Sequence, residues 1–314
     1  MGKMPTDTKS QSASPGNIFV LLKDSAVQLM RHNPLRMAAA TAFFTTFALP
    51  PILIILFTVS RLFMGQEIMG PKLRSELTAA LGPEAVEQIL DIAKAMRDLT
   101  DNWLFAAGGF LFLMFVATTL FKIIRDSISE IWQINIVATK RFKYNITARL
   151  RSLVIILSIG VLLIAGVALE GIRAYLGQYI NTVPESVSLV FRSVLNDVLS
   201  FTLVTFWFST LFRYLPLGRP IWKVAFVGGF VTGILFTIGK FVLRASLNQS
   251  NLSNIFGTSA SIVLILLFVF YSSLILYYGA SFTHIYAQRT KRPVKPLSYA
   301  GYYTVNKVTE DDPV

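Results

Sequence analysis

The chain contains no cysteine and only two histidines among its 314 residues. Without cysteine it forms neither a disulfide nor a thiolate metal site. His32 and His284 are far apart in the sequence, and neither has a second histidine or a carboxylate at the spacing of a metal site. No Walker motif is present either. We therefore expect no catalytic residues, no metal site and no cofactor, and we expect that the chain is not an enzyme.

Charged residues are also scarce, at 15% of the chain, where soluble domains average about 25%. Hydrophobic residues make up 54%, and six long apolar runs contain most of them. Each run is near or above the ~20 residues with which a helix crosses ~30 Å of hydrocarbon. A backbone in lipid must satisfy its own hydrogen bonds, so the runs predict an all-α integral membrane protein with six transmembrane helices. The expected spans are residues 37–60, 103–121, 152–176, 198–215, 222–243 and 259–285.

Basic residues crowd alternate gaps between these runs. Of the 29 lysines and arginines, 20 lie in the two terminal segments and in the second and fourth gaps, and nine lie elsewhere. The positive-inside rule then places both termini in the cytoplasm. The same charge attracts anionic lipid headgroups, so membrane lipids are the expected partners. No interleaved aromatic and basic motif accompanies the charge, and we expect no nucleic-acid partner.

The segments outside the spans divide the chain further. Residues 1–16 are polar and predict a disordered cytoplasmic tail, whereas residues 17–286 form the membrane domain. Residues 17–33 are amphipathic but too short to span, which indicates either an N-terminal interfacial helix or a helix packed on the cytoplasmic loops. Residues 66–102 predict a small helical extracytoplasmic cap between the first two spans, either a packed cover or a mobile gate. Residues 287–314 predict a flexible cytoplasmic tail.

Two consecutive prolines, Pro50 and Pro51, lie near the middle of the first span. Neither donates a backbone hydrogen bond, and each ring clashes with the preceding turn, so the helix should kink or break there. Broken helices at membrane depth occur where protein or a water-filled cavity covers the freed carbonyls. A kink for packing and a break that binds substrate both remain open.

Charged and amide residues gather in the outer half of the predicted membrane domain. Ionisable residues within spans are costly and are candidates for function. Two of these residues, Lys240 and Arg244, lie four apart on one helix face and repel each other unless an anion lies between them. The candidate substrate-binding residues are Glu170, Arg173, Asp197, Lys240, Arg244, Asn248 and Asn254.

Three interpretations of this cluster remain open. Glu170 and Asp197 could neutralise the cations in a structural ion-pair network. Alternatively, an outward-facing polar cavity binds an anionic group, with arginine making bidentate contacts and lysine acting as a point charge. Thirdly, the long side chains could extend to the membrane surface.

Glycines recur in the later spans. Gly229 and Gly233 have the small-xxx-small spacing that lets helix backbones approach closely. We interpret them as packing positions within the chain in preference to a dimer interface.

Four stretches of the sequence carry a resemblance to a known family. They are residues 38–44 with Ala48-Leu49-Pro50-Pro51, residues 128–132, Leu215-Pro216 with Trp222 and Gly228-Gly229, and residues 255–257 leading into residues 271–280. Together they resemble the YihY/BrkB family of bacterial inner-membrane proteins. This chain departs from the family pattern in having Phe43 and Phe44 for tyrosines, Phe268 for a tryptophan and Ser281 for an acidic residue.

The resemblance implies a six-helix, multi-pass protein of the bacterial inner (plasma) membrane, usually described as a transporter. The family was formerly labelled ribonuclease BN, but the chain lacks the clustered carboxylate or histidine ligands of metal-dependent phosphodiester cleavage. Our first hypothesis is a transporter or lipid translocator for an anionic amphipathic molecule, a small molecule or a lipid headgroup. The alternative is a non-catalytic membrane scaffold. The oligomeric state does not follow from the sequence.

Overall fold

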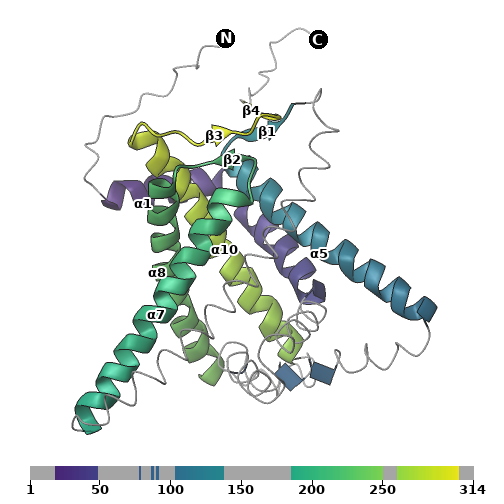
Figure 1. Cartoon of the computed structure of the whole chain (residues 1–314), viewed down its shortest axis with the longest axis vertical. Helices are drawn as coiled ribbons and strands as arrows, with labels where there is room; N and C mark the ends of the chain where they lie inside the picture. The colour runs from purple at the N-terminus through teal and green to yellow at the C-terminus, as the bar shows by residue number, and fades with distance from the viewer. Residues whose placement is uncertain are drawn as a thin grey trace.

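The computed structural model of the chain describes residues 18–48, 78, 86–87, 90–91, 103–137, 185–249 and 260–303, most of which are helical. The helices are α1 (Ile18–Met30), an unlabelled helix over residues 34–48, α5 (Trp103–Ile131), α7 (Glu185–Tyr214), α8 (Trp222–Gln249) and α10 (Ala260–Arg289) (Figure 1). Of the expected cap, five residues are described, and all five are helical. The expected span 152–176 and the first span beyond residue 48 lie outside the described residues.

Two described helical segments are long and apolar enough to cross a membrane. They are Trp222–Val242 in α8 and Ile265–Arg289 in α10. These segments match the expected fifth and sixth spans within a few residues. The other four spans and the cap remain predictions.

Several helices extend well beyond the apolar runs that predicted them. α5 continues to Ile131, about ten residues past the expected end, and α7 begins at Glu185, well before residue 198. Helical backbone hydrogen bonds do not require apolar side chains. A hydropathy pattern therefore locates the part of a helix that is suited to lipid and underestimates the length of the whole helix.

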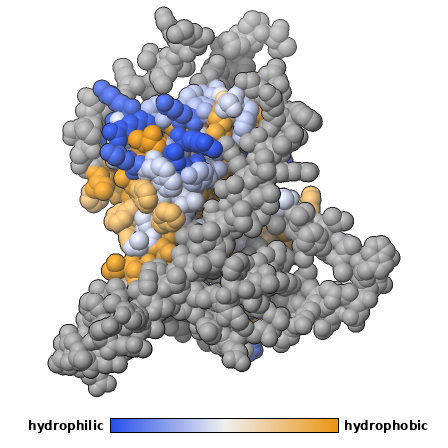
Figure 2. Space-filling model, in the orientation of Figure 1, coloured by the Kyte–Doolittle hydropathy of each residue, from blue (hydrophilic) through white to orange (hydrophobic). Residues whose placement is uncertain are grey.

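Four short strands lie together at one end of the bundle, which we call the strand end (Figure 1). β1 (Ile134–Ile136) pairs with β4 (Ala300–Tyr302), and β2 (Gly218–Arg219) pairs with β3 (Lys295–Pro296), both antiparallel. The strands thus tie the segment after α10 to the ends of α5 and α7. Figure 2 shows hydrophilic residues gathered at this end and hydrophobic residues along the helices beneath it.

The predicted flexible tail is wrong for its first part. Residues 287–303 complete α10, form β3 and β4, and bury Val294 and Tyr299. The Leu297 amide donates to the Leu217 carbonyl at 3.0 Å, and the Tyr303 amide donates to the Gln133 carbonyl at 3.0 Å. The basic composition suggested a solvated tail, but its few apolar residues insert into the core. Residues 304–314 lie outside the described residues.

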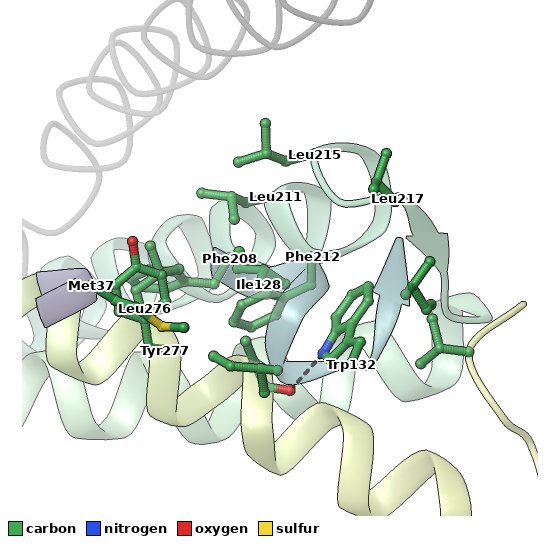
Figure 3. Packing of buried hydrophobic residues seen from close by; sticks show 14 of the residues in the cluster. Met37, Ile128, Trp132, Phe208, Leu211, Phe212, Leu215, Leu217, Leu276 and Tyr277 are labelled. Carbon is green, nitrogen blue, oxygen red and sulfur yellow. Dashed lines mark hydrogen bonds between the residues drawn. The ribbon is translucent and has the colours of Figure 1, made fainter. Parts of the chain in front are cut away.

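A buried core lies directly beneath the strands (Figure 3). Trp132 is fully buried beside Ile128 and Phe212, and its indole Nε1 donates a hydrogen bond to the Ala280 carbonyl at 2.9 Å. Ser129, one turn before Trp132, accepts a hydrogen bond from the Leu217 amide at 3.0 Å. This core therefore joins α5, α7 and α10 at the strand end.

α1 packs across α10 near the strand end. Leu21, Ser25 and Leu29 recur at intervals of four and form its buried face. The Ser281 hydroxyl donates to the Ser25 carbonyl at 2.8 Å, and Asp24 pairs with Arg289. The structure thus supports a packed helix over residues 18–30.

Candidate functional site

The structure describes part of the predicted charged cluster. Asp197 lies in α7 and Lys240 in α8, and both side chains are exposed. Arg244 and Asn248 lie in the last two turns of α8, where only the backbone is described. The remaining predicted residues, namely Glu170, Arg173, Asn254, Pro50 and Pro51, lie outside the described residues.

Close packing of α7 on α8 determines how far along the helix axes Asp197 and Lys240 lie relative to each other. A Cβ atom on Gly229 would lie 2.2 Å from the Ser209 hydroxyl oxygen and 2.7 Å from the Thr205 carbonyl oxygen. On Gly233, a Cβ atom would lie 2.9 Å from the Thr205 hydroxyl oxygen. These contacts confirm that the two glycines are packing positions within the chain.

The same contacts define an antiparallel register. Moving four residues forward on α8, from Gly229 to Gly233, shifts the contact about one turn backward on α7, from Ser209 to Thr205. Two further turns along this register bring Asp197 to the level of Lys240. β2 lies between the end of α7 and the start of α8, and both residues lie in the halves of these helices that are far from β2.

Asp197 and Lys240 are not joined as an ion pair. No described carboxylate lies within 4.0 Å of the Lys240 ammonium group, and no described cation lies that close to Asp197. Lys240 instead stands beside exposed apolar side chains, with Ile238 52% exposed and Phe241 72% exposed. Within the described part of the cluster, the arrangement is an exposed cation and an exposed anion on adjacent helices.

The structure also reveals polar contacts at the strand end that the sequence did not predict. The hydroxyl oxygens of Thr41 and Tyr277 lie 2.5 Å apart in a buried hydrogen bond. Thr41 and Tyr277 each belong to one of the stretches that carry the family resemblance. That shared membership was the available signal, although nothing in the sequence paired the two residues.

Other members of the resembling stretches meet in the same region. Trp132 donates to Ala280, and Gly279 packs against Thr232, whose hydroxyl oxygen would lie 1.9 Å from a Cβ atom on that glycine. Ser281, which replaces the family's acidic residue, donates to the Ser25 carbonyl in a buried contact. An ionised carboxylate has no proton to donate in this way. The described members of the resembling stretches therefore pack together in one structural core.

The two histidines of the chain make separate contacts. His284 is buried in α10, with its Nε2 atom 2.9 Å from Gln288 Nε2. The His32 Nδ1 atom lies 2.8 Å from the Gln28 carbonyl oxygen. Among the residues that the structure describes, no group of three or more histidines or carboxylates could hold a metal ion.

At the strand end, outside the candidate spans, packing shifts the pKa of one tyrosine. Burial raises the pKa of the Tyr303 phenol, and the negative charge of Glu130 raises it further. Glu130 also faces Arg36, with a nitrogen–oxygen distance of 3.5 Å. The strand end thus combines a buried core with a charged rim.

Comparison with known proteins places the chain among membrane proteins. The family model described as "Virulence factor BrkB" matches residues 26–300. A "UPF0761 membrane protein" of Teredinibacter turnerae is 25% identical over 82% of this chain and 59% of that protein. A protein of the same name from Saccharophagus degradans is 26% identical over 80% of this chain and 56% of its own length. Another from Psychromonas ingrahamii is 28% identical over 54% of this chain and 55% of its own length.

The chain thus spans less than three-fifths of the length of these relatives. No solved structure shows a significant match. The family match extends from within α1 to the start of β4, which includes most of the described residues. Since the match covers well over half of the sequence, the chain belongs to the BrkB family of membrane proteins, as the resembling stretches predicted.

Proposed function

We propose that this protein binds and translocates an anionic amphipathic molecule, and that the headgroup binds at the end of α7 and α8 that is far from the strands. The observation that carries the proposal is the exposed Lys240, which has no ion-pair partner among the described residues and lies level with Asp197. An uncompensated cation at the end of an apolar helix attracts phosphate or carboxylate groups.

The surroundings of Lys240 suit the apolar part of such a molecule. Three residues within two positions of Lys240 in the sequence have exposed apolar side chains, namely Ile238, Phe241 and Val242. Arg244 follows one turn later on the same helix, which would place a second cation near the same headgroup. Asp197 and Glu170 are then the carboxylates available to couple binding to protons.

The alternative is a membrane scaffold in which the charged residues form a structural network. That interpretation requires Lys240 to be neutralised by a carboxylate, and Asp197, the carboxylate level with it in the register, is not its partner. Glu170, the other carboxylate of the predicted network, lies outside the described residues, and among the described residues Lys240 is available to a ligand.

The proposal is tested by mass spectrometry of the lipids and small anions that co-purify with the protein. The wild type is compared with Lys240→Gln/Arg244→Gln and with the control Arg219→Gln/Lys223→Gln. The control removes two exposed cations near the opposite end of α8, so both variants lose the same charge.

We expect a specific anionic species to be retained by the wild type and the control and to be lost from the Lys240/Arg244 variant. Equal retention in all three proteins would refute the headgroup site. If the Lys240/Arg244 variant alone failed to accumulate in membranes, the structural network would be the better account.

A further inference from the structure

We propose that the outward face of α1 binds anionic lipids in the leaflet at the strand end. This surface is separate from the headgroup site above, because α1 lies near the strand end (Figure 1), whereas Lys240 lies in the half of α8 that is far from β2. Three features of α1 support this proposal: its exposed side chains, the position along α10 at which it packs, and the sign of the charge on its outward face.

The face of α1 that points away from the protein carries three exposed apolar side chains, with the exposed Lys23 among them. Phe19 is 79% exposed, Met30 is 74% exposed and Val27 is 47% exposed. With 3.6 residues per turn, these three side chains fall within an arc of about 80°. The buried face, formed by Leu21, Ser25 and Leu29, lies on the other side of the helix. A helix that needed only to pack on α10 would carry polar residues on its outward face.

The level of α1 places this face against lipid. α1 contacts α10 through Ser281, which donates to Ser25, and through Tyr278, whose hydroxyl donates to the Leu22 carbonyl at 3.0 Å. Both α10 residues lie within the apolar segment Ile265–Arg289, about 12–17 Å before its end. The side of α1 opposite a membrane-crossing helix points laterally, into the layer that surrounds that helix.

Figures 1 and 2 agree with this level. The described surface changes from hydrophilic to hydrophobic near the height at which α1 lies. Interfacial helices typically lie with their apolar side buried about 5–10 Å into the boundary between headgroups and acyl chains.

Charge selects the class of lipid. Lys23 and Arg31 are exposed beside the apolar residues, whereas Asp24 is paired with Arg289. The exposed charged residues of the outward face are therefore cations, which fit anionic phosphate headgroups. A second copy of the chain fits less well, because a two-fold contact through this face would bring the same cations together.

The test uses the absence of cysteine, which makes the wild-type chain a ready background for single-cysteine spin labelling. Labels at Phe19→Cys and Met30→Cys are compared in nanodiscs with labels at two exposed controls. Phe230→Cys lies within the candidate span of α8 and reports lipid, and Asn135→Cys lies in β1 and reports water. The collision rates of each label with oxygen, which concentrates in lipid, and with a nickel chelate, which stays in water, show whether the label lies in lipid or in water.

We expect the oxygen-to-nickel collision ratio at Phe19 and Met30 to exceed that at Asn135 several-fold and to approach that at Phe230. We also expect the ratio to rise when phosphatidylglycerol is mixed into phosphatidylcholine, and this rise to disappear in Lys23→Gln/Arg31→Gln. A ratio equal to that at Asn135 would show that the face meets water. Poor collision with both reagents would show that protein covers it, and an unchanged ratio on adding phosphatidylglycerol would remove the anionic preference. Each of these results would overturn the proposal.

Discussion

Thr41 and Tyr277 lie 236 residues apart in the sequence, yet their hydroxyl oxygens are 2.5 Å apart in a buried hydrogen bond. The Thr41 hydroxyl also donates a hydrogen bond to the Met37 carbonyl at 2.9 Å. The bond between Thr41 and Tyr277 therefore fastens the helix over residues 34–48 to α10.

Replacing Tyr277 with phenylalanine should destabilise the protein by about 1 kcal/mol, the typical net value of a hydrogen bond between neutral groups. The ring remains in place, so the change isolates the hydroxyl. Thermal unfolding of the purified protein in detergent measures it. Tyr278→Phe, which removes a less buried hydrogen bond to Leu22, serves as the control and should cost less. An equal loss in both variants would contradict a special role for the Thr41–Tyr277 pair.

Gly229→Leu should disrupt the packing of α7 on α8. A side chain there meets the Thr205 carbonyl at 2.7 Å and the Ser209 amide at 2.8 Å, and backbone atoms cannot rotate away. We expect a loss of at least 1–3 kcal/mol, as for other overpacked cores, measured by unfolding or by the yield of monodisperse protein.

Gly108→Ala in α5 is the matched control for Gly229→Leu, because no atom lies within 4 Å of the position its Cβ would take. Alanine should leave stability unchanged or raise it by about 0.5–1 kcal/mol, since glycine is a poor residue in a helix. If Gly229→Leu were as stable as the wild type, the close approach of the two helices would be wrong.

Removal of residues 290–314 should destabilise the strand end. This truncation deletes β3 and β4 and the buried side chains of Val294 and Tyr299. Each fully buried side chain of this kind contributes about 1.5–3 kcal/mol, so the melting temperature should fall clearly. Removal of residues 304–314 alone should leave it nearly unchanged. Equal melting temperatures for the two truncations would mean that the strands add nothing to stability.

The orientation of the chain can be measured with single cysteines. If the strand end faces the cytoplasm, as the distribution of lysine and arginine predicts, Asn135→Cys should react with a membrane-impermeant maleimide only after the cells are opened. Lys240→Cys, near the other end of α8, should react in intact spheroplasts. The reverse pattern would invert the topology.

The sequence predicted the parts of the fold that depend on long patterns. The two candidate spans in α8 and α10 follow from apolar length, and the packing role of Gly229 and Gly233 follows from their spacing. Strands of two or three residues, such as β2 and β3, have no periodicity to detect, and each partner lies in a distant part of the chain. Their existence could not be read from composition.

The candidate site was predictable to a similar extent. The expected topology is enough to bring Asp197 and Lys240 into the same half of the membrane, but whether they form an ion pair depends on side-chain conformation. The buried bond between Thr41 and Tyr277 depends on how the helix over residues 34–48 crosses α10. Only the three-dimensional arrangement shows which motif residues meet.

We propose that Lys240 and Arg244, far from the strand end, serve the movement of an anionic amphipathic molecule. The most direct measurement is dithionite quenching of fluorescently labelled phosphatidylglycerol in proteoliposomes. The wild type and Arg219→Gln/Lys223→Gln should both expose the inner-leaflet lipid faster than protein-free vesicles do, and Lys240→Gln/Arg244→Gln should not. Identical rates in protein-free vesicles and in all three proteins would contradict translocation of this lipid class, and equally fast rates in all three proteins would contradict the role of Lys240 and Arg244.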